Sequence, residues 1–84
     1  METILIVEDD EKIARVIELE LDYAGYDVCI AHSGKAALQL YQERQIDLIL
    51  LDVMIPDLNG LEVLRRIRND DDYIKIIMLT ARDE

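Results

Sequence analysis

Carboxylates that follow two short apolar runs are the side chains of this sequence best suited to chemistry. The run Ile4–Val7 leads into Glu8 and Asp9. The run Leu48–Leu51 leads into Asp52. Short continuous apolar runs are typical of strands buried on both faces of a parallel sheet. Carboxylates placed beyond two such strands repel one another unless a cation, a proton or a phosphoryl group compensates for their charge.

Mg²⁺ is the simplest counter-charge for such a cluster, because it prefers carboxylate, carbonyl and water oxygens and accepts few protein ligands. Asp9 and Asp52 could bind it directly, and Glu8 could bind it through water. The backbone carbonyl of Met54 could complete the site. A carboxylate beside a cation can also attack phosphorus and form an aspartyl phosphate, and Asp52 is the candidate. The hydroxyl of Thr80, after the last apolar run, could hydrogen-bond the phosphoryl group.

Several of these side chains also have structural interpretations. Glu8 and Asp9 could simply favour a helix dipole, and Asp10 is favoured as a helix N-cap. His32 is expected to have a loop role, because no metal or nucleophile partner is evident beside it in the sequence. Cys29, the only cysteine, is expected to be a structural thiol, and its being alone excludes an internal disulfide.

The elements that must position these residues alternate between strand and helix. Apolar runs predict strands over residues 3–7, 26–31, 47–51 and 74–79. Helical spacing predicts helices over residues 11–24 and 35–44, and a third between the loop that ends at Gly60 and the acidic segment 69–72. Asp10 and Ser33 are the predicted N-caps, and Gly25 is the predicted stop of the first helix. The inward faces are predicted to be Ile13, Val16, Ile17, Leu21 and Ala24, then Ala37, Leu40 and Tyr41, then Leu61, Leu64 and Ile67.

This alternation predicts an α/β fold with a doubly wound parallel sheet of strand order 2-1-3-4. The second strand alternates between apolar and polar residues, which favours an edge position. Ligands of open α/β sheets bind beyond the carboxyl ends of the strands, where the strand order reverses. The first and third strands flank that point, so the acids should meet there.

Length and charge narrow the possible functions. The chain has 84 residues, enough for one small domain over residues 1–84, and a formal net charge of −10. An acidic surface argues against unaided binding to nucleic acid, which needs clustered Lys and Arg. The sequence shows no signal-peptide pattern, and no apolar run approaches the roughly 18 residues of a membrane span. We therefore expect a cytoplasmic protein.

Three motifs together resemble the receiver domain of bacterial two-component response regulators. Residues 6–10 resemble its acidic turn, residues 47–60 its phospho-acceptor strand and loop, and residues 78–81 its switch strand. The middle motif is long and specific. The resemblance covers the whole chain. In these motifs the sequence is most similar to receivers of transcription regulators with a winged-helix output domain. The resemblance implies a flavodoxin-like fold.

The resemblance also implies a role for each residue of the acidic cluster. Asp52 would accept the phosphoryl group from a sensor histidine kinase or a small acyl phosphate. Asp9 would bind Mg²⁺ directly and Glu8 through water, with the Met54 carbonyl as a further ligand. Thr80 would act as the switch residue. Such a protein is a phosphoryl acceptor rather than a conventional enzyme, and it would reach DNA through an attached output domain.

The resemblance further implies that a receiver continues beyond the fourth strand with another helix, strand and helix. We therefore expect residues 1–84 to be a partial receiver that lacks the family's catalytic lysine. Lys75 cannot replace that lysine, because it enters the fourth strand at the wrong end. We expect impaired phosphorylation, and self-association through an exposed edge of the fourth strand.

Two alternatives remain open from the sequence. One is a Mg²⁺-dependent phosphatase with Asp52 as nucleophile, although such enzymes need a second Asp where Met54 stands. The other is an interaction module that assembles without phosphorylation.

Overall fold

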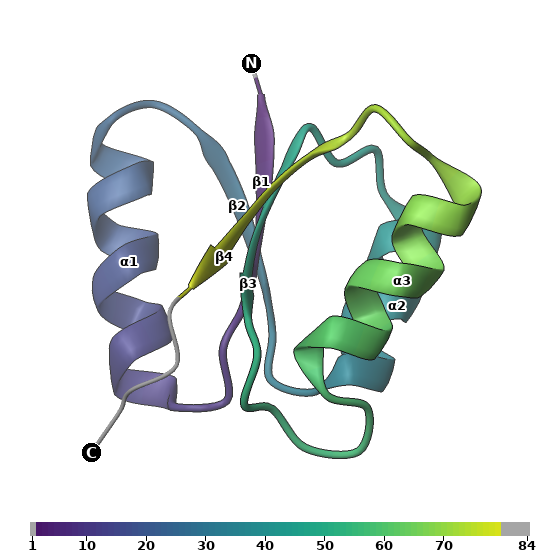
Figure 1. Ribbon diagram of the computed structural model, residues 1–84. Helices are drawn as coiled ribbons and strands as arrows, with labels where there is room; N and C mark the ends of the chain where they lie inside the picture. Colours follow the sequence, from purple (N-terminus) through teal and green to yellow (C-terminus); the bar gives the residue numbers. More distant parts are fainter. Residues whose placement is uncertain (1, 80–84) are drawn as a thin grey trace.

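Four parallel strands form the centre of the computed structural model, which describes residues 2–79 (Figure 1). The strands are β1 (Thr3–Val7), β2 (Asp27–Ala31), β3 (Leu48–Asp52) and β4 (Lys75–Leu79). They alternate with the helices α1 (Glu11–Tyr23), α2 (Gly34–Glu43) and α3 (Gly60–Asp70). The strand order is β2-β1-β3-β4, so the predicted doubly wound, flavodoxin-like sheet is confirmed, with β2 at an edge.

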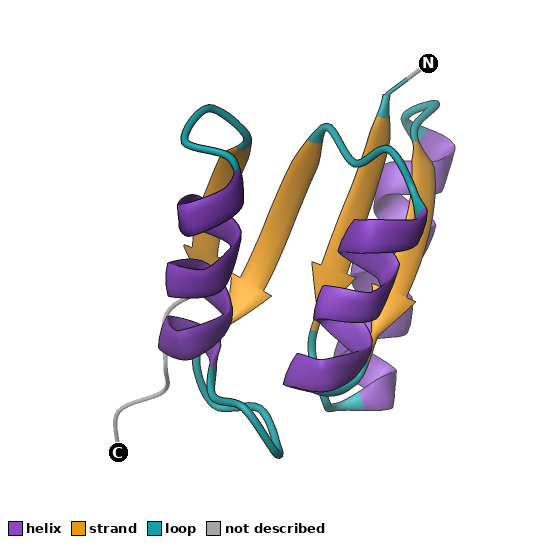
Figure 2. Ribbon diagram, turned by 90° about the vertical axis from the view of Figure 1, so that its right-hand side faces the viewer, coloured by secondary structure: helices purple, strands orange, loops and turns teal. Residues whose placement is uncertain are grey.

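The helices cover the two faces of the sheet unequally. α1 lies on one face, while α2 and α3 lie together on the other (Figures 1 and 2). α1 contacts β1 and β2. The side that carries α2 and α3 holds the main core, whose strand residues Leu5, Ile49 and Leu51 are fully buried. This arrangement sends the loops that follow β1, β2 and β3 to the same edge of the sheet, at the bottom of Figure 1.

Local signals start and stop the helices as predicted. Asp10 Oδ1 accepts hydrogen bonds from the N–H groups of Lys12 and Ile13, at 2.9 and 3.1 Å. Ser33 Oγ accepts one from the Ala36 N–H at 3.1 Å. Gly25 has φ +101°, a conformation that favours glycine after a helix. The predicted element boundaries are correct to within about one residue of those observed.

The predicted inward face of α1 is wrong in part. Ile13 and Val16 are 40% and 60% exposed, and Ala24 is also exposed. Ala14 is fully buried instead, and Ile17 is half-buried. Because α1 packs over β1 and β2, the side of the helix that carries Val16 is left largely exposed.

The predicted inward face of α3 is confirmed at Leu64 and Ile67, which pack in the core, and is wrong at Leu61. Leu61 is 58% exposed, whereas Val63 and Ile67 are fully buried. A Cβ added at Gly60 would lie 2.3 Å from the carbonyl oxygen of Asp52. This close packing sets the rotation of α3 about its axis, so that the stripe of Gly60, Val63 and Ile67 faces the sheet and Leu61 faces solvent. The predicted face of α2 is confirmed, since Ala37 is fully buried.

Candidate functional site

Three carboxylates converge where β1 and β3 end. Glu8 and Asp9 directly follow β1, and Asp52 is the last residue of β3. One carboxylate oxygen from each residue lies within 4.8 Å of the other two. The two strands are neighbours in the sheet, with Val7 paired to Leu51, so their carboxyl ends coincide. The predicted meeting of these acids is therefore observed.

The cluster is partly shielded from solvent. Glu8 and Asp52 are 5% and 6% exposed, while Asp9 is exposed. Burial raises the pKa of Glu8, and the neighbouring charges of Asp52 and Asp9 raise it further. A hydrogen bond from the Asp10 N–H to Glu8 Oε2, at 3.1 Å, opposes this shift. The site therefore concentrates negative charge at a cost in free energy that a cation would offset.

The donor set fits Mg²⁺. Its side-chain ligands are all carboxylate oxygens, which hard cations prefer, and two of them are buried. One oxygen of Asp52 accepts the Met54 N–H at 3.2 Å, which holds the carboxylate against the following turn. The Met54 side chain is 63% exposed. Thr80, the predicted switch residue, lies outside the described residues.

The loop that follows β3 is held by close backbone contacts. The Gly60 N–H donates to the Val53 carbonyl at 2.8 Å, closing the loop below Asp52. Asp57, within this loop, has φ +61° and accepts the Lys35 N–H at 3.0 Å. Burial opposes ionisation of Asp57, but hydrogen bonds from the Leu58 and Lys35 N–H groups outweigh it and lower its pKa. The loop is thereby tied to the start of α2.

Sequence reasoning missed the structural importance of the β2–α2 corner. A Cβ at Gly34 would lie 2.3 Å from the Leu58 carbonyl oxygen, and the Gly34 N–H donates to the Pro56 carbonyl at 3.2 Å. On its other side, His32 Nδ1 lies 2.8 Å from the Glu8 carbonyl oxygen. The sequence around Ser33 identifies the start of a helix, because capping depends on neighbouring residues. The contacts of this corner with Leu58, Pro56 and Glu8 join residues far apart in the sequence, so no local pattern predicts them.

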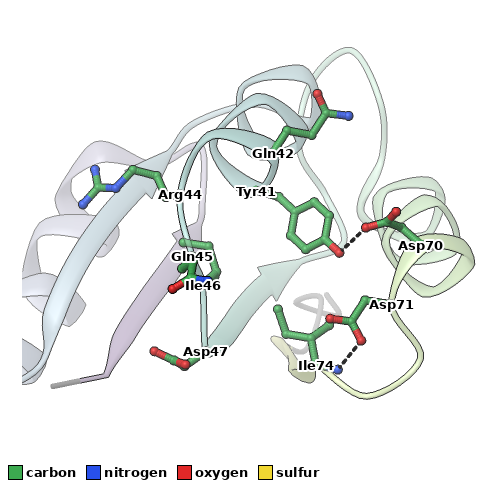
Figure 3. Close-up of a pocket in the computed structure, with 9 residues that line it drawn as sticks. All are labelled: Tyr41, Gln42, Arg44, Gln45, Ile46, Asp47, Asp70, Asp71 and Ile74. Carbon is green, nitrogen blue, oxygen red and sulfur yellow. Dashed lines mark hydrogen bonds between the residues drawn. The ribbon is translucent and has the colours of Figure 1, made fainter.

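Two surface hollows lie at different distances from the acid cluster, one beside it and one at the other end of the sheet. An open, largely apolar hollow of about 500 Å³ adjoins Asp9 and is bordered by Met54 and Leu61. Another, of about 490 Å³, lies at the opposite end of the sheet (Figure 3). There the Tyr41 hydroxyl donates to Asp70 at 2.7 Å, joining α2 to the end of α3. The hollow beside Asp9 is thus the one that adjoins the predicted chemistry.

The strand order and the acid cluster at the carboxyl ends of β1 and β3 are those expected from the resemblance to a receiver domain. The chain belongs to the response regulator receiver domain family, whose model matches residues 4–84. This membership excludes the phosphatase alternative, because receivers are phosphoryl acceptors and not conventional enzymes.

Curated relatives are transcriptional regulators. The chain is 59% identical over 80 residues to the transcriptional regulatory protein YkoG of Bacillus subtilis, covering 95% of this chain and 35% of YkoG. It is 48% identical over 84 residues to the response regulator ArlR of Staphylococcus saprophyticus, covering 100% of this chain and 38% of ArlR. The chain therefore spans little more than a third of the length of these relatives.

Solved structures share both the fold and the sequence pattern. The response regulator TrrA of Thermotoga maritima, in complex with Mg²⁺-BeF, matches with a TM-score of 0.93 and 37% identity over 99% of this chain and 72% of that one. TrrA in complex with the histidine kinase ThkA matches with a TM-score of 0.91 and 37% identity, covering 100% and 72%. Among the described residues, no helix has the length and apolar character needed to cross a membrane.

Proposed function

We propose that Asp52 accepts a phosphoryl group from a phosphohistidine of a sensor histidine kinase, with Mg²⁺ held at the acid cluster. The observation that carries the proposal is the approach of Glu8, Asp9 and Asp52 to within 4.8 Å of one another. Asp9 and Asp52 would hold the metal directly, Glu8 through water, and Met54 through its backbone carbonyl. Mg²⁺ bound there would neutralise charge on the transferring oxygens.

The reaction needs a carboxylate that is ionised and held in place. A carboxylate oxygen of Asp52 attacks phosphorus, the P–O bond forms as the P–N bond of the donor breaks, and the imidazole nitrogen keeps the electron pair. The hydrogen bond from the Met54 N–H holds one oxygen of Asp52 and leaves the other for attack. The apolar hollow beside Asp9 provides a wall for the part of the donor that carries the phosphoryl group.

Phosphorylation would then act as a switch. Adding a phosphoryl group changes charge and hydrogen bonding at Asp52, which biases a two-state arrangement of the loop and of the segment that contains Thr80. We propose that residues 1–84 form part of one receiver domain, and that the output is an attached DNA-binding domain in a cytoplasmic regulator. The transcriptional regulators among its relatives support that output.

Labelling with a small acyl phosphate tests the proposal directly. With Mg²⁺ and this donor, intact-mass measurement should detect one added phosphoryl group on the 84-residue chain, and chelation of Mg²⁺ should abolish it. Asp52→Asn should abolish labelling, whereas the control Asp10→Asn, which keeps a capping oxygen, should retain it. Labelling of Asp52→Asn equal to that of the wild type would place the acceptor elsewhere.

Beryllofluoride separates the switch from an interaction module that works without phosphorylation. With Mg²⁺ it mimics the acyl phosphate, and the relative TrrA has been crystallised with this pair. The amide signals of Asp52 and Thr80 should shift in the NMR spectrum on its addition. Unchanged signals would favour the module.

We also propose that the 84-residue chain self-associates through β4. Within the described residues β4 pairs with β3 on one side alone, and Ile77 is 52% exposed. Exposed apolar strand edges pair with other chains. Sedimentation velocity should therefore give a mass that rises with concentration, and Ile77→Lys should reduce it, while the control Leu61→Lys on α3 should not. A monomer at every concentration would refute this part.

A further inference from the structure

We propose that His32 is a positioning residue for the metal-binding turn, acting through the backbone of Glu8. His32 is the first residue after β2, and its Nδ1 lies 2.8 Å from the carbonyl oxygen of Glu8. This inference rests on the proposed function, since the turn it holds is the one that carries Glu8 and Asp9. His32 itself supplies no ligand.

The contact fixes which ring nitrogen carries the proton. A carbonyl oxygen can accept a hydrogen bond but cannot donate one, so Nδ1 must be the donor. Neutral His32 is therefore the Nδ1–H tautomer, with Nε2 unprotonated. The hydrogen bond lies in a part-buried setting, where a carbonyl left without a donor would cost free energy.

The two hydrogen-bonding groups of the Glu8 backbone are both held by the end of β2. The Glu8 N–H donates to the Ala31 carbonyl at 3.0 Å, which extends the pairing of β1 with β2 by one step. The chain then leaves the sheet to begin α2, and the His32 side chain provides the next donor. The N–H and the carbonyl of Glu8 are thus both hydrogen-bonded by residues at the end of β2. These two bonds limit where the carboxylates of Glu8 and Asp9 can lie.

The same corner also holds the loop that follows Asp52. The Gly34 N–H donates to the Pro56 carbonyl, and the Lys35 N–H donates to Asp57. Four consecutive residues, 32–35, therefore connect the turn that carries Glu8 to the loop that follows Asp52. A shift of the His32 contact would change the spacing of the carboxylates, and metal affinity depends strongly on that spacing.

Two substitutions of His32 separate the hydrogen bond from the bulk of the ring. In His32→Leu the donor is lost, and Mg²⁺ affinity of the 84-residue chain, measured by calorimetric titration, should fall about three- to tenfold. In His32→Asn the side-chain amide can replace the Nδ1–H donor, and affinity should be largely restored. Asp71→Ala is the matched control, because it removes hydrogen bonds to the Tyr73 and Ile74 N–H groups at the far end of the sheet. It should lower stability without changing Mg²⁺ affinity.

NMR of the metal-free protein gives a readout that does not depend on Mg²⁺. Nitrogen shifts of the ring should identify His32 as the Nδ1–H tautomer, and His32→Leu should move the amide signals of Glu8 and Asp9 while His32→Asn returns them. An Nε2–H tautomer, or His32→Leu with unchanged signals and affinity, would overturn the inference. If the wild type binds no Mg²⁺, the proposed function fails, while the tautomer and amide signals still decide the role of His32.

Discussion

Glu8 and Asp52, which are far apart in the sequence, bring carboxylate oxygens to within 4.8 Å of each other at one edge of the sheet. Both residues are more than nine-tenths buried, so their repulsion is poorly screened by water. The fold therefore tolerates an unfavourable charge pair at the place where the proposed chemistry needs two carboxylates. This relationship makes stability, pH and Mg²⁺ interdependent.

Removing one of these charges should stabilise the metal-free protein. Asp52→Asn keeps an oxygen to accept the Met54 N–H but removes the repulsion, so its unfolding free energy in chelator should rise by about 1–3 kcal/mol. Added Mg²⁺ should stabilise the wild type and have little effect on the variant. Urea denaturation with and without Mg²⁺ measures both effects. The exposed control Asp72→Asn, which changes net charge equally, should show neither; equal gains in the two variants would contradict a specific repulsion.

The raised pKa of Glu8 predicts a pH dependence of defined sign. Above its ordinary value of 4.5 and below its raised value, the folded state binds more protons at Glu8 than the unfolded state does. The stability that Glu8 contributes is therefore present below pH 4.5 and is lost as pH rises through the raised pKa. In chelator, the wild type should lose stability relative to Glu8→Gln across this window, measured by urea denaturation at successive pH values. A constant difference would argue against the shift.

Tyr41 should lose its stabilising contribution at alkaline pH. Burial, and then its hydrogen bond to Asp70, raises the pKa of Tyr41 from 10.0 to about 12. Its contribution to stability is thus complete below pH 10.0 and is lost as pH rises toward about 12. The difference in phenolate absorbance between the wild type and Tyr41→Phe should show a midpoint near pH 12. A midpoint near 10.0 would mean that Tyr41 is neither buried nor hydrogen-bonded to Asp70 in solution.

Two glycine substitutions should separate site geometry from general stability. Gly60→Ala places a Cβ 2.3 Å from the Asp52 carbonyl oxygen, so it should cost about 1–3 kcal/mol and weaken Mg²⁺ binding. Gly25→Ala has open space around its Cβ but a φ of +101°, so it should destabilise the fold and leave Mg²⁺ affinity unchanged. Thermal denaturation and calorimetric titration measure the two properties. Equal losses of affinity would show that Gly60 has no special relation to the site.

The observed rotation of α3 can be tested with two apolar residues. Ile67→Ala should cost about 2–5 kcal/mol, because it leaves a cavity in the core. Leu61→Ala should change stability by less than about 0.5 kcal/mol, because Leu61 is exposed. Urea denaturation compares them. A large loss in Leu61→Ala would mean that Leu61 is buried in solution, as its helical spacing predicted.

The sequence by itself determined the order of the elements, the parallel sheet and the meeting of the acids. Apolar runs that end in Glu8 and in Asp52 are local signals, and adjacent parallel strands bring their carboxyl ends together. The caps Asp10 and Ser33 were also readable, because capping involves residues only a few positions apart.

Tertiary structure decided which side of each helix is buried and what holds the loops of the site. Helical periodicity predicts that an apolar stripe exists, but the exact rotation depends on what the helix packs against, as the close approach of Gly60 to β3 shows for α3. The contact of His32 with Glu8 joins residues distant in the sequence and leaves no periodic pattern. Such long-range contacts exist only once the sheet has brought the loops together, and they set the positions of the carboxylates.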